Sequence, residues 1–168
     1  DSSVRAGAIA ALGAISNEDA ATLARPMLNE EDPRIRATAA AALATSTRPD
    51  DLDLAEAALV SLIADTSEGA RNARRDVAAA IGQTSQPRFR RLLIPLLYDP
   101  APDVADEAMA SVGAARTDDF VFVPTLIALL RHRRLKGSAR TVLVGYGEPV
   151  VDALAHFMRA PEEDIWVR

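Results

Sequence analysis

The stretch Val4-Arg-Ala-Gly-Ala-Ile-Ala-Ala-Leu-Gly13 decides the fold, because the same pattern returns along the chain. Further ten-residue copies begin at Ile35, Ala73, Val104 and, more loosely, Ser138, and Val167-Arg168 starts another. The first residues of successive copies are 31, 38, 31, 34 and 29 positions apart. A period in the thirties that is carried by helical segments predicts an α-solenoid.

The first four copies have apolar residues at their first, fifth and ninth positions. A four-residue spacing places such residues on one side of a helix, so each copy predicts one buried helical stripe. The small alanines beside the stripe favour close approach of neighbouring helices. The clearest stripes are Val4, Ala8 and Leu12, then Ile35, Ala39 and Leu43, and then Val104, Ala108 and Val112.

Residues that begin and end helices flank the stripes. Aspartate lies three residues before three of the copies, where a carboxylate caps free N–H groups, at Asp1, Asp32 and Asp164. Glycine follows the ninth position of four copies, where we expect helix C-caps that tolerate a positive φ, at Gly13, Gly82, Gly113 and Gly147. The N-capping aspartate, the apolar stripe and the final glycine recur at the same positions in several copies, which supports a helical repeat.

The pattern D-x-x-V-R-x-x-A-x-x-A-L-G over residues 1–13 resembles the HEAT repeat, in the short bacterial form known as the PBS-lyase HEAT-like repeat. Residues 32–44 match it with Ala44 in place of the last glycine, and the resemblance covers essentially the whole chain. It implies an all-α fold, a right-handed α-solenoid superhelix of about five HEAT-like helix pairs.

We expect one repeat domain over residues 1–168. Its repeats would span 1–31, 32–65, 66–99, 100–132 and 133–160, with the start of another at 161–168. In the second repeat, a polar connection over Thr45–Asp51 would join the two helices. Neither end has the features of a polar capping repeat, so we expect a domain excised from a longer protein.

Composition excludes several classes of function. The formal charge is −5, so the chain as a whole lacks the basic character of a nucleic-acid-binding domain. There is no cysteine, which excludes disulfides, thiolate chemistry and cysteine-ligated zinc. No apolar run reaches about 18 residues and no secretory leader opens the chain, so we expect no membrane insertion and a cytoplasmic protein or portion of one.

Two groups of basic residues stand out. The third repeat contains Arg71, Arg74, Arg75, Arg88, Arg90 and Arg91. A second group, with no acidic residue between 131 and 140, comprises Arg131, Arg133, Arg134, Lys136 and Arg140. Stacked repeats would align these side chains into a ridge that attracts phosphate or an acidic protein. The alternative is a solvated face balanced by Asp76, Asp103, Asp106 and Glu107.

One arginine position recurs within the repeat itself. Arg5, Arg36 and Arg74 all occupy the second position of their copies. We expect them to form a ladder with aspartates between repeats rather than a binding site. In the fourth repeat, the alternating Phe120-Val-Phe-Val stretch should enter the second helix and pack both phenylalanines on the repeat interface.

The resemblance also implies a concave groove, because the second helices line the inner face of HEAT-like arrays. Aligning those helices places six polar residues near that surface, namely Arg25, Ser61, Arg91, Thr125, Asp152 and His156. Ordinary solvent-facing polar residues would produce the same pattern, so this alternative stays open.

Enzymatic function has little support in the sequence. His132 and His156 are the only histidines, and neither belongs to an H-E-x-x-H motif or a His-Glu pair. No G-x-S-x-G nucleophile elbow is present. We therefore predict no catalytic residue, no metal and no cofactor. A lyase-type subunit, the second alternative, would rest on the family name alone.

The sequence thus predicts a non-catalytic module for protein–protein interaction or scaffolding, monomeric, with a protein rather than nucleic acid as partner. The alternative is an anionic-ligand or nucleic-acid binder that uses the arginines of the third and fourth repeats. The candidate binding surface comprises Arg25, Ser61, Arg88, Arg90, Arg91, Thr125, Arg131, Asp152 and His156.

Overall fold

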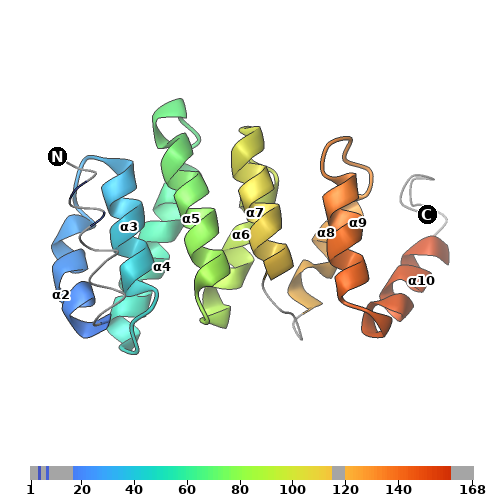
Figure 1. Cartoon of the computed structure of the whole chain (residues 1–168), viewed down its shortest axis with the longest axis horizontal. Helices are drawn as coiled ribbons and strands as arrows, with labels where there is room; N and C mark the ends of the chain where they lie inside the picture. The colour runs from blue at the N-terminus through green and yellow to red at the C-terminus, as the bar shows by residue number, and fades with distance from the viewer. Residues whose placement is uncertain (1–3, 5–6, 8–16, 115–119, 160–168) are drawn as a thin grey trace. The chain divides into compact units, whose positions relative to one another are not determined.

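The computed structural model describes residues 4, 7, 17–114 and 120–159. These residues form helices joined by short turns, and no strand occurs among them (Figure 1). The predicted all-α class is therefore confirmed. The chain divides into two compact units, Asp1–Ser111 and Val112–Arg168. Arg5, Gly13 and the predicted caps Asp1 and Asp164 lie outside the described residues, as does the repeat expected at 161–168.

The first unit is a series of helices that each pack on their neighbours in sequence. In order they are α2 (Asn17–Met27), α3 (Pro33–Leu43), α4 (Pro49–Ala64), the 3₁₀ turn η1 (Glu68–Ala70), α5 (Arg71–Gln83), the 3₁₀ segment η2 (Pro87–Leu92) and α6 (Leu93–Leu97). The next helix, α7 (Pro102–Ala114), begins in this unit and ends in the second. The helix α3 packs on α2, on its own repeat partner α4 and on the next first helix, α5 (Figure 1).

The buried stripes lie where the sequence predicts them in the well-matched repeats. Ile35, Ala39 and Leu43 are buried on α3, and the corresponding residues of α5 and α7 are buried too, namely Ala73, Val77, Ile81, Val104, Ala108 and Val112. The prediction for Val4 is wrong, because its side chain is 67% exposed and no described residue covers it.

The second unit contains the 3₁₀ turn η3 (Phe120–Phe122), α8 (Val123–Leu129), α9 (Lys136–Gly145), the 3₁₀ turn η4 (Glu148–Val150) and α10 (Val151–Arg159). The pair α8 and α9 pack against each other. The predicted packing of both phenylalanines is confirmed only for Phe122, which is fully buried. Phe120 is 45% exposed, and its ring stacks on that of Tyr146, with ring centroids 5.8 Å apart.

In the fifth copy of the ten-residue pattern, the buried face of the helix begins one residue later than the sequence predicts. Ser138, its expected first position, is exposed, whereas Ala139 and Leu143 are buried against the unit's core. A shift of one residue turns the helix face by about 100°. Arg140 therefore follows the first buried position, as Arg36 follows Ile35 in the second repeat.

The predicted caps have mixed outcomes. Asp32 caps α3 by accepting a hydrogen bond from the Arg34 backbone N–H at 2.9 Å, and Pro33 follows as the first helical residue. Of the predicted glycine C-caps, Gly147 has a positive φ of 69°, but Gly82 and Gly113 lie inside α5 and α7. Their C-cap prediction is wrong, because both helices continue past the glycine.

Gly82 serves a close helix contact. A Cβ atom at this position would come within 2.5 Å of Ser111 Oγ and 2.6 Å of Ser111 Cβ, both on α7. The Ser111 hydroxyl donates to the Ala78 carbonyl of α5 at 2.9 Å. Only a residue without a side chain lets these two helices approach this closely. The last glycine of the repeat pattern is thus a packing feature here.

Candidate interaction surfaces

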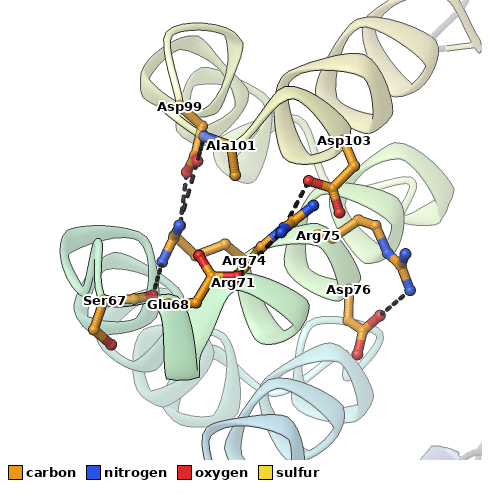
Figure 2. A network of polar contacts seen from close by, with 9 residues as sticks. All are labelled: Ser67, Glu68, Arg71, Arg74, Arg75, Asp76, Asp99, Ala101 and Asp103. Atoms are coloured by element: carbon orange, nitrogen blue, oxygen red, sulfur yellow. Dashed lines mark hydrogen bonds and ion pairs between the residues drawn. The ribbon is translucent and has the colours of Figure 1, made fainter.

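Arg74 on α5 is a buried charged residue, at 1% exposure (Figure 2). Its guanidinium donates to both carboxylate oxygens of Asp99, at 2.6 and 3.3 Å. It also donates to the backbone carbonyls of Asp65 and of Ser67, the latter at 3.0 Å. Asp99 in turn accepts from the Ala101 N–H at 2.8 Å. Because Arg74 is buried and hydrogen-bonded to Asp99 and to two carbonyls, its role in the fold is structural.

The same repeat position has a related role one repeat earlier. Arg36 donates to the carbonyls of Glu30 and Glu31, at 3.0 and 3.1 Å. These carbonyls belong to the turn after α2, just as Asp65 is the C-cap residue of α4. Both arginines thus satisfy carbonyls left free where the preceding second helix ends. Arg74 pairs with an aspartate as predicted, whereas the hydrogen bonds of Arg36 go to backbone carbonyls and its positive charge acts on Asp65 only electrostatically.

Arg71 joins α5 to the start of α7 (Figure 2). It donates to Asp103 at 2.9 Å and to Glu68 at 3.0 Å. The hydrogen bond from Arg71 holds the pKa of Asp103 below its usual value, against the opposing effect of burial. Asp76 takes part in two longer ion pairs, with Arg34 at 3.5 Å and Arg75 at 4.0 Å. These contacts support the interpretation of the third-repeat arginines as a face balanced by carboxylates.

A second buried carboxylate lies where the sequence predicted a connecting loop. The helix α4 begins at Pro49, so Asp51 occupies its first turn instead of the predicted connection, and its side chain is fully buried. Arg25 of α2 donates to Asp51 Oδ1 at 2.7 Å, and the Ser46 hydroxyl donates to Oδ2 at 2.8 Å. Chiefly through the Arg25 hydrogen bond, the pKa of Asp51 is lowered from its ordinary value.

Arg88 on η2 is engaged with the exposed side of α4. Its guanidinium donates to Asp53 at 2.8 Å and to Glu56, and these hydrogen bonds raise the pKa of Arg88. The same group lies over the Phe89 ring, 5.6 Å from its centroid. The positive charge of Arg88 is therefore matched by two carboxylates within the chain.

The nine predicted surface residues divide between the two units. Arg25, Ser61, Arg88, Arg90 and Arg91 belong to the first, and Thr125, Arg131, Asp152 and His156 to the second. Arg25 and Arg88 are bonded to carboxylates, Arg90 and Thr125 are half-buried, and the remaining five are exposed. Of the exposed arginines, Arg91 and Arg131 make no ion pair with a described residue.

An apolar face that the sequence analysis did not identify runs along α4. Leu54 and Val60 are 43% and 48% exposed, and Ala57 and Ala64 are exposed on the same side. Their spacing of three or four residues places them in one row, together with the predicted surface residue Ser61. One feature of the sequence could have revealed this face. The helix α4 has more apolar residues than the three that form its buried stripe, Ala55, Leu59 and Leu62.

Within residues 4, 7, 17–114 and 120–159, no three histidine or acidic side chains are grouped so that they could hold a metal ion. The described helices include none that is long and apolar enough to cross a bilayer.

Comparison with known families identifies the first part of the chain. Residues 1–71 match a family model described as HEAT repeats. No curated protein and no solved structure matches the chain. The matched range contains α2, α3 and α4, together with the Arg25–Asp51 pair and the exposed row of α4. The PBS-lyase HEAT-like subtype stays a prediction.

Proposed function

Because residues 1–71 of this chain are HEAT repeats, we propose that it is a non-catalytic protein-interaction module, with the exposed face of α4 as its main contact surface. HEAT repeats commonly mediate protein–protein interaction or scaffolding. The partner would lie along α4 and cover its apolar row.

The observation that carries this proposal is the apolar row of Leu54, Ala57, Val60 and Ala64. Single exposed apolar side chains are normal on protein surfaces, but a continuous row on one helix is characteristic of a contact site. Asp50 and Asp53 are exposed at the start of the same helix and would give the site a polar rim.

The buried ion pairs support a scaffold that holds this face in place. Arg25 ties α2 to Asp51 in the first turn of α4, and Arg74 ties α5 to the C-cap residue of α4, Asp65. Both ends of α4 are therefore bonded to neighbouring helices. A preorganised surface loses little conformational entropy when a partner binds.

The alternative of an anionic-ligand site in the third repeat has less support. Arg71 and Arg88 are bonded to carboxylates, and Arg74 is buried. Binding phosphate there would require breaking contacts that already neutralise these cations.

The test compares three immobilised baits in a lysate of the source organism, with quantitative mass spectrometry of the retained proteins. They are the wild-type chain, Leu54→Glu/Val60→Glu on α4, and the control Tyr98→Glu/Val151→Glu. The control replaces two other exposed apolar residues, which are 55% and 54% exposed, with the same change in charge.

We expect a protein retained by the wild type and the control but reduced at least about tenfold with the α4 variant, since two unpaired charges would enter an apolar interface. The same set of proteins on all three baits would contradict a role for α4. Circular dichroism of the three baits would establish that each is folded.

A further inference from the structure

A group of exposed basic residues lies around the turn between α8 and α9 in the second unit. The unit as a whole, residues 112–168, contains eight lysine and arginine residues and seven acidic ones, but residues 131–140 contain five basic residues and no acidic one. Four of the basic residues are exposed and make no ion pair with any described residue, namely Arg131, Arg133, Lys136 and Arg140.

The contrast with the first unit is the basis for a functional interpretation. There, Arg71 and Arg88 are also at the surface, but each donates to two carboxylates of the chain. Arg131, Arg133, Lys136 and Arg140, at and after the α8–α9 turn, make no such ion pair with a described residue. Unpaired cations in a group raise the local potential and attract an acidic partner.

The turn that carries these cations is held by hydrogen bonds. The Lys136 N–H donates to the His132 carbonyl at 3.0 Å, and the Leu135 N–H donates to His132 Nδ1 at 3.3 Å. Leu135 itself is buried. Arg131 and Arg133 therefore project from an ordered turn directly before α9, so the cluster is preorganised for binding.

An apolar contact point continues the cationic row along α9. Lys136, Arg140 and Val144 follow one another at four-residue spacing, which places them side by side along the helix. Val144 is 73% exposed, the largest value among the large apolar side chains that the structure describes. A ligand that binds along this row would place acidic groups against Lys136 and Arg140 and an apolar side chain against Val144.

We propose that the α8–α9 turn and the exposed row of α9 bind an acidic peptide segment of a partner protein, with carboxylates on Arg131, Arg133, Lys136 and Arg140 and an apolar residue on Val144. This inference deepens the proposed interaction function by naming a partner chemistry, and it rests on that function. It uses a surface in the second unit that shares no residue with the α4 face.

A peptide fits this surface better than nucleic acid for two reasons. Single-stranded nucleic acid gains much of its affinity from stacking on free aromatic rings, whereas Phe120 and Tyr146, among the residues that the structure describes in this unit, stack on each other. The net charge of the whole chain also opposes a long polyanion.

The test is fluorescence anisotropy with the full chain and a labelled synthetic peptide of about fourteen residues. The peptide is rich in Glu, including two Glu four residues apart, and has one Leu four residues after the second of these. A peptide of the same composition with Gln for Glu is the ligand control. The variant is Lys136→Glu/Arg140→Glu, and its charge-matched control is Arg75→Glu/Arg91→Glu, both exposed on the first unit.

We expect binding of the acidic peptide to weaken about tenfold or more in Lys136→Glu/Arg140→Glu and to change less than about twofold in the control. Val144→Ala should weaken binding by a smaller factor, and the Gln peptide should not bind. Raising the salt from about 50 to 300 mM should weaken binding, since the contacts are exposed.

Equal loss in the two double variants, or no binding of the acidic peptide by folded wild-type protein, would overturn the proposal. Tighter binding of a single-stranded or duplex oligonucleotide than of the peptide would overturn it in favour of nucleic acid. Either failure would leave the α4 bait comparison unaffected, because those substitutions lie in the other unit. Thermal melts followed by circular dichroism would check that the exposed substitutions preserve the fold.

Discussion

The Arg74 guanidinium donates Nε to one carboxylate oxygen of Asp99 at 2.6 Å and Nη2 to the other at 3.3 Å, and both side chains are buried. Asp99 belongs to the turn between α6 and α7, so the pair joins the first helix of one repeat to the entrance of the next. The Asp65 and Ser67 carbonyls complete the arginine's hydrogen bonds. A buried charge whose three nitrogen atoms are all hydrogen-bonded destabilises the protein when its partner is removed.

Arg74→Met should destabilise the protein by about 3–5 kcal/mol, because it leaves the Asp99 carboxylate buried without its countercharge. Urea denaturation at neutral pH would measure the loss. Arg75→Met, on the same helix but exposed, should change stability by less than about 0.5 kcal/mol. Similar losses for the two variants would contradict the structural role of Arg74.

Asp51 should make the stability of the folded protein depend on pH in the acid range. The Arg25 hydrogen bond, helped by the Ser46 hydroxyl, lowers the pKa of Asp51 in the folded state, although burial acts in the opposite direction. Its contribution is therefore present above the ordinary aspartate pKa of about 3.9 and is lost as the pH falls through the lower folded value.

Asp51→Asn should consequently be less stable than the wild type at pH 7, with the difference shrinking as the pH falls below about 4. Urea midpoints measured over a pH series would reveal this convergence. Some acid dependence should persist, since Asp65 and Asp103 also have lowered pKa values. If the urea midpoints of the variant and the wild type changed in parallel with pH, the pKa of Asp51 would not be lowered in the folded state.

Gly82→Ala should destabilise the protein by about 1–3 kcal/mol, because the new methyl group would overlap Ser111 across the α5–α7 contact. Gly137→Ala is the matched control, since a Cβ there meets no atom within 4 Å and alanine favours the helix. It should be neutral or stabilising by up to about 1 kcal/mol. Thermal melts would compare the two variants, and Ser111→Gly should partly rescue Gly82→Ala.

Leu43→Ala should cost about 2–5 kcal/mol, because Leu43 is the last residue of the α3 stripe and is fully buried. Leu54→Ala offers the same chemical change at a residue that is 43% exposed, and should cost less than about 1 kcal/mol. Chemical denaturation of both variants would test the difference. A loss below about 1 kcal/mol for Leu43→Ala would refute its place in the core.

Predictions from helix periodicity were the most successful. The stripe of Ile35, Ala39 and Leu43 is buried, and Asp32 caps the helix that carries it. These features depend on residues three or four apart, which one helix brings together without help from distant segments. The fifth repeat was misplaced by one residue because Ser138 and Ala139 are both compatible with the repeat pattern.

Predictions about charged side chains were less successful. Asp51 was assigned to a connecting loop, and nothing in its local sequence indicated burial against Arg25. Arg88 was considered for a binding surface, yet it is matched by Asp53 and Glu56. In each case the partner lies 26 or more residues away, so its identity depends on how helices stack.

The sequence by itself determined that the described part of the chain is helical, that residues 1–71 resemble HEAT repeats, and which residues of the copies at Ile35, Ala73 and Val104 face the core. Those properties follow from apolar spacing and capping, which act within a single helix. The tertiary structure decided that Gly82 serves a helix contact, that Arg74 and Asp51 are buried in ion pairs, and that Val60 and Val144 remain exposed. Each of these depends on which atoms of another helix come within contact distance, and one helix's sequence does not contain that information.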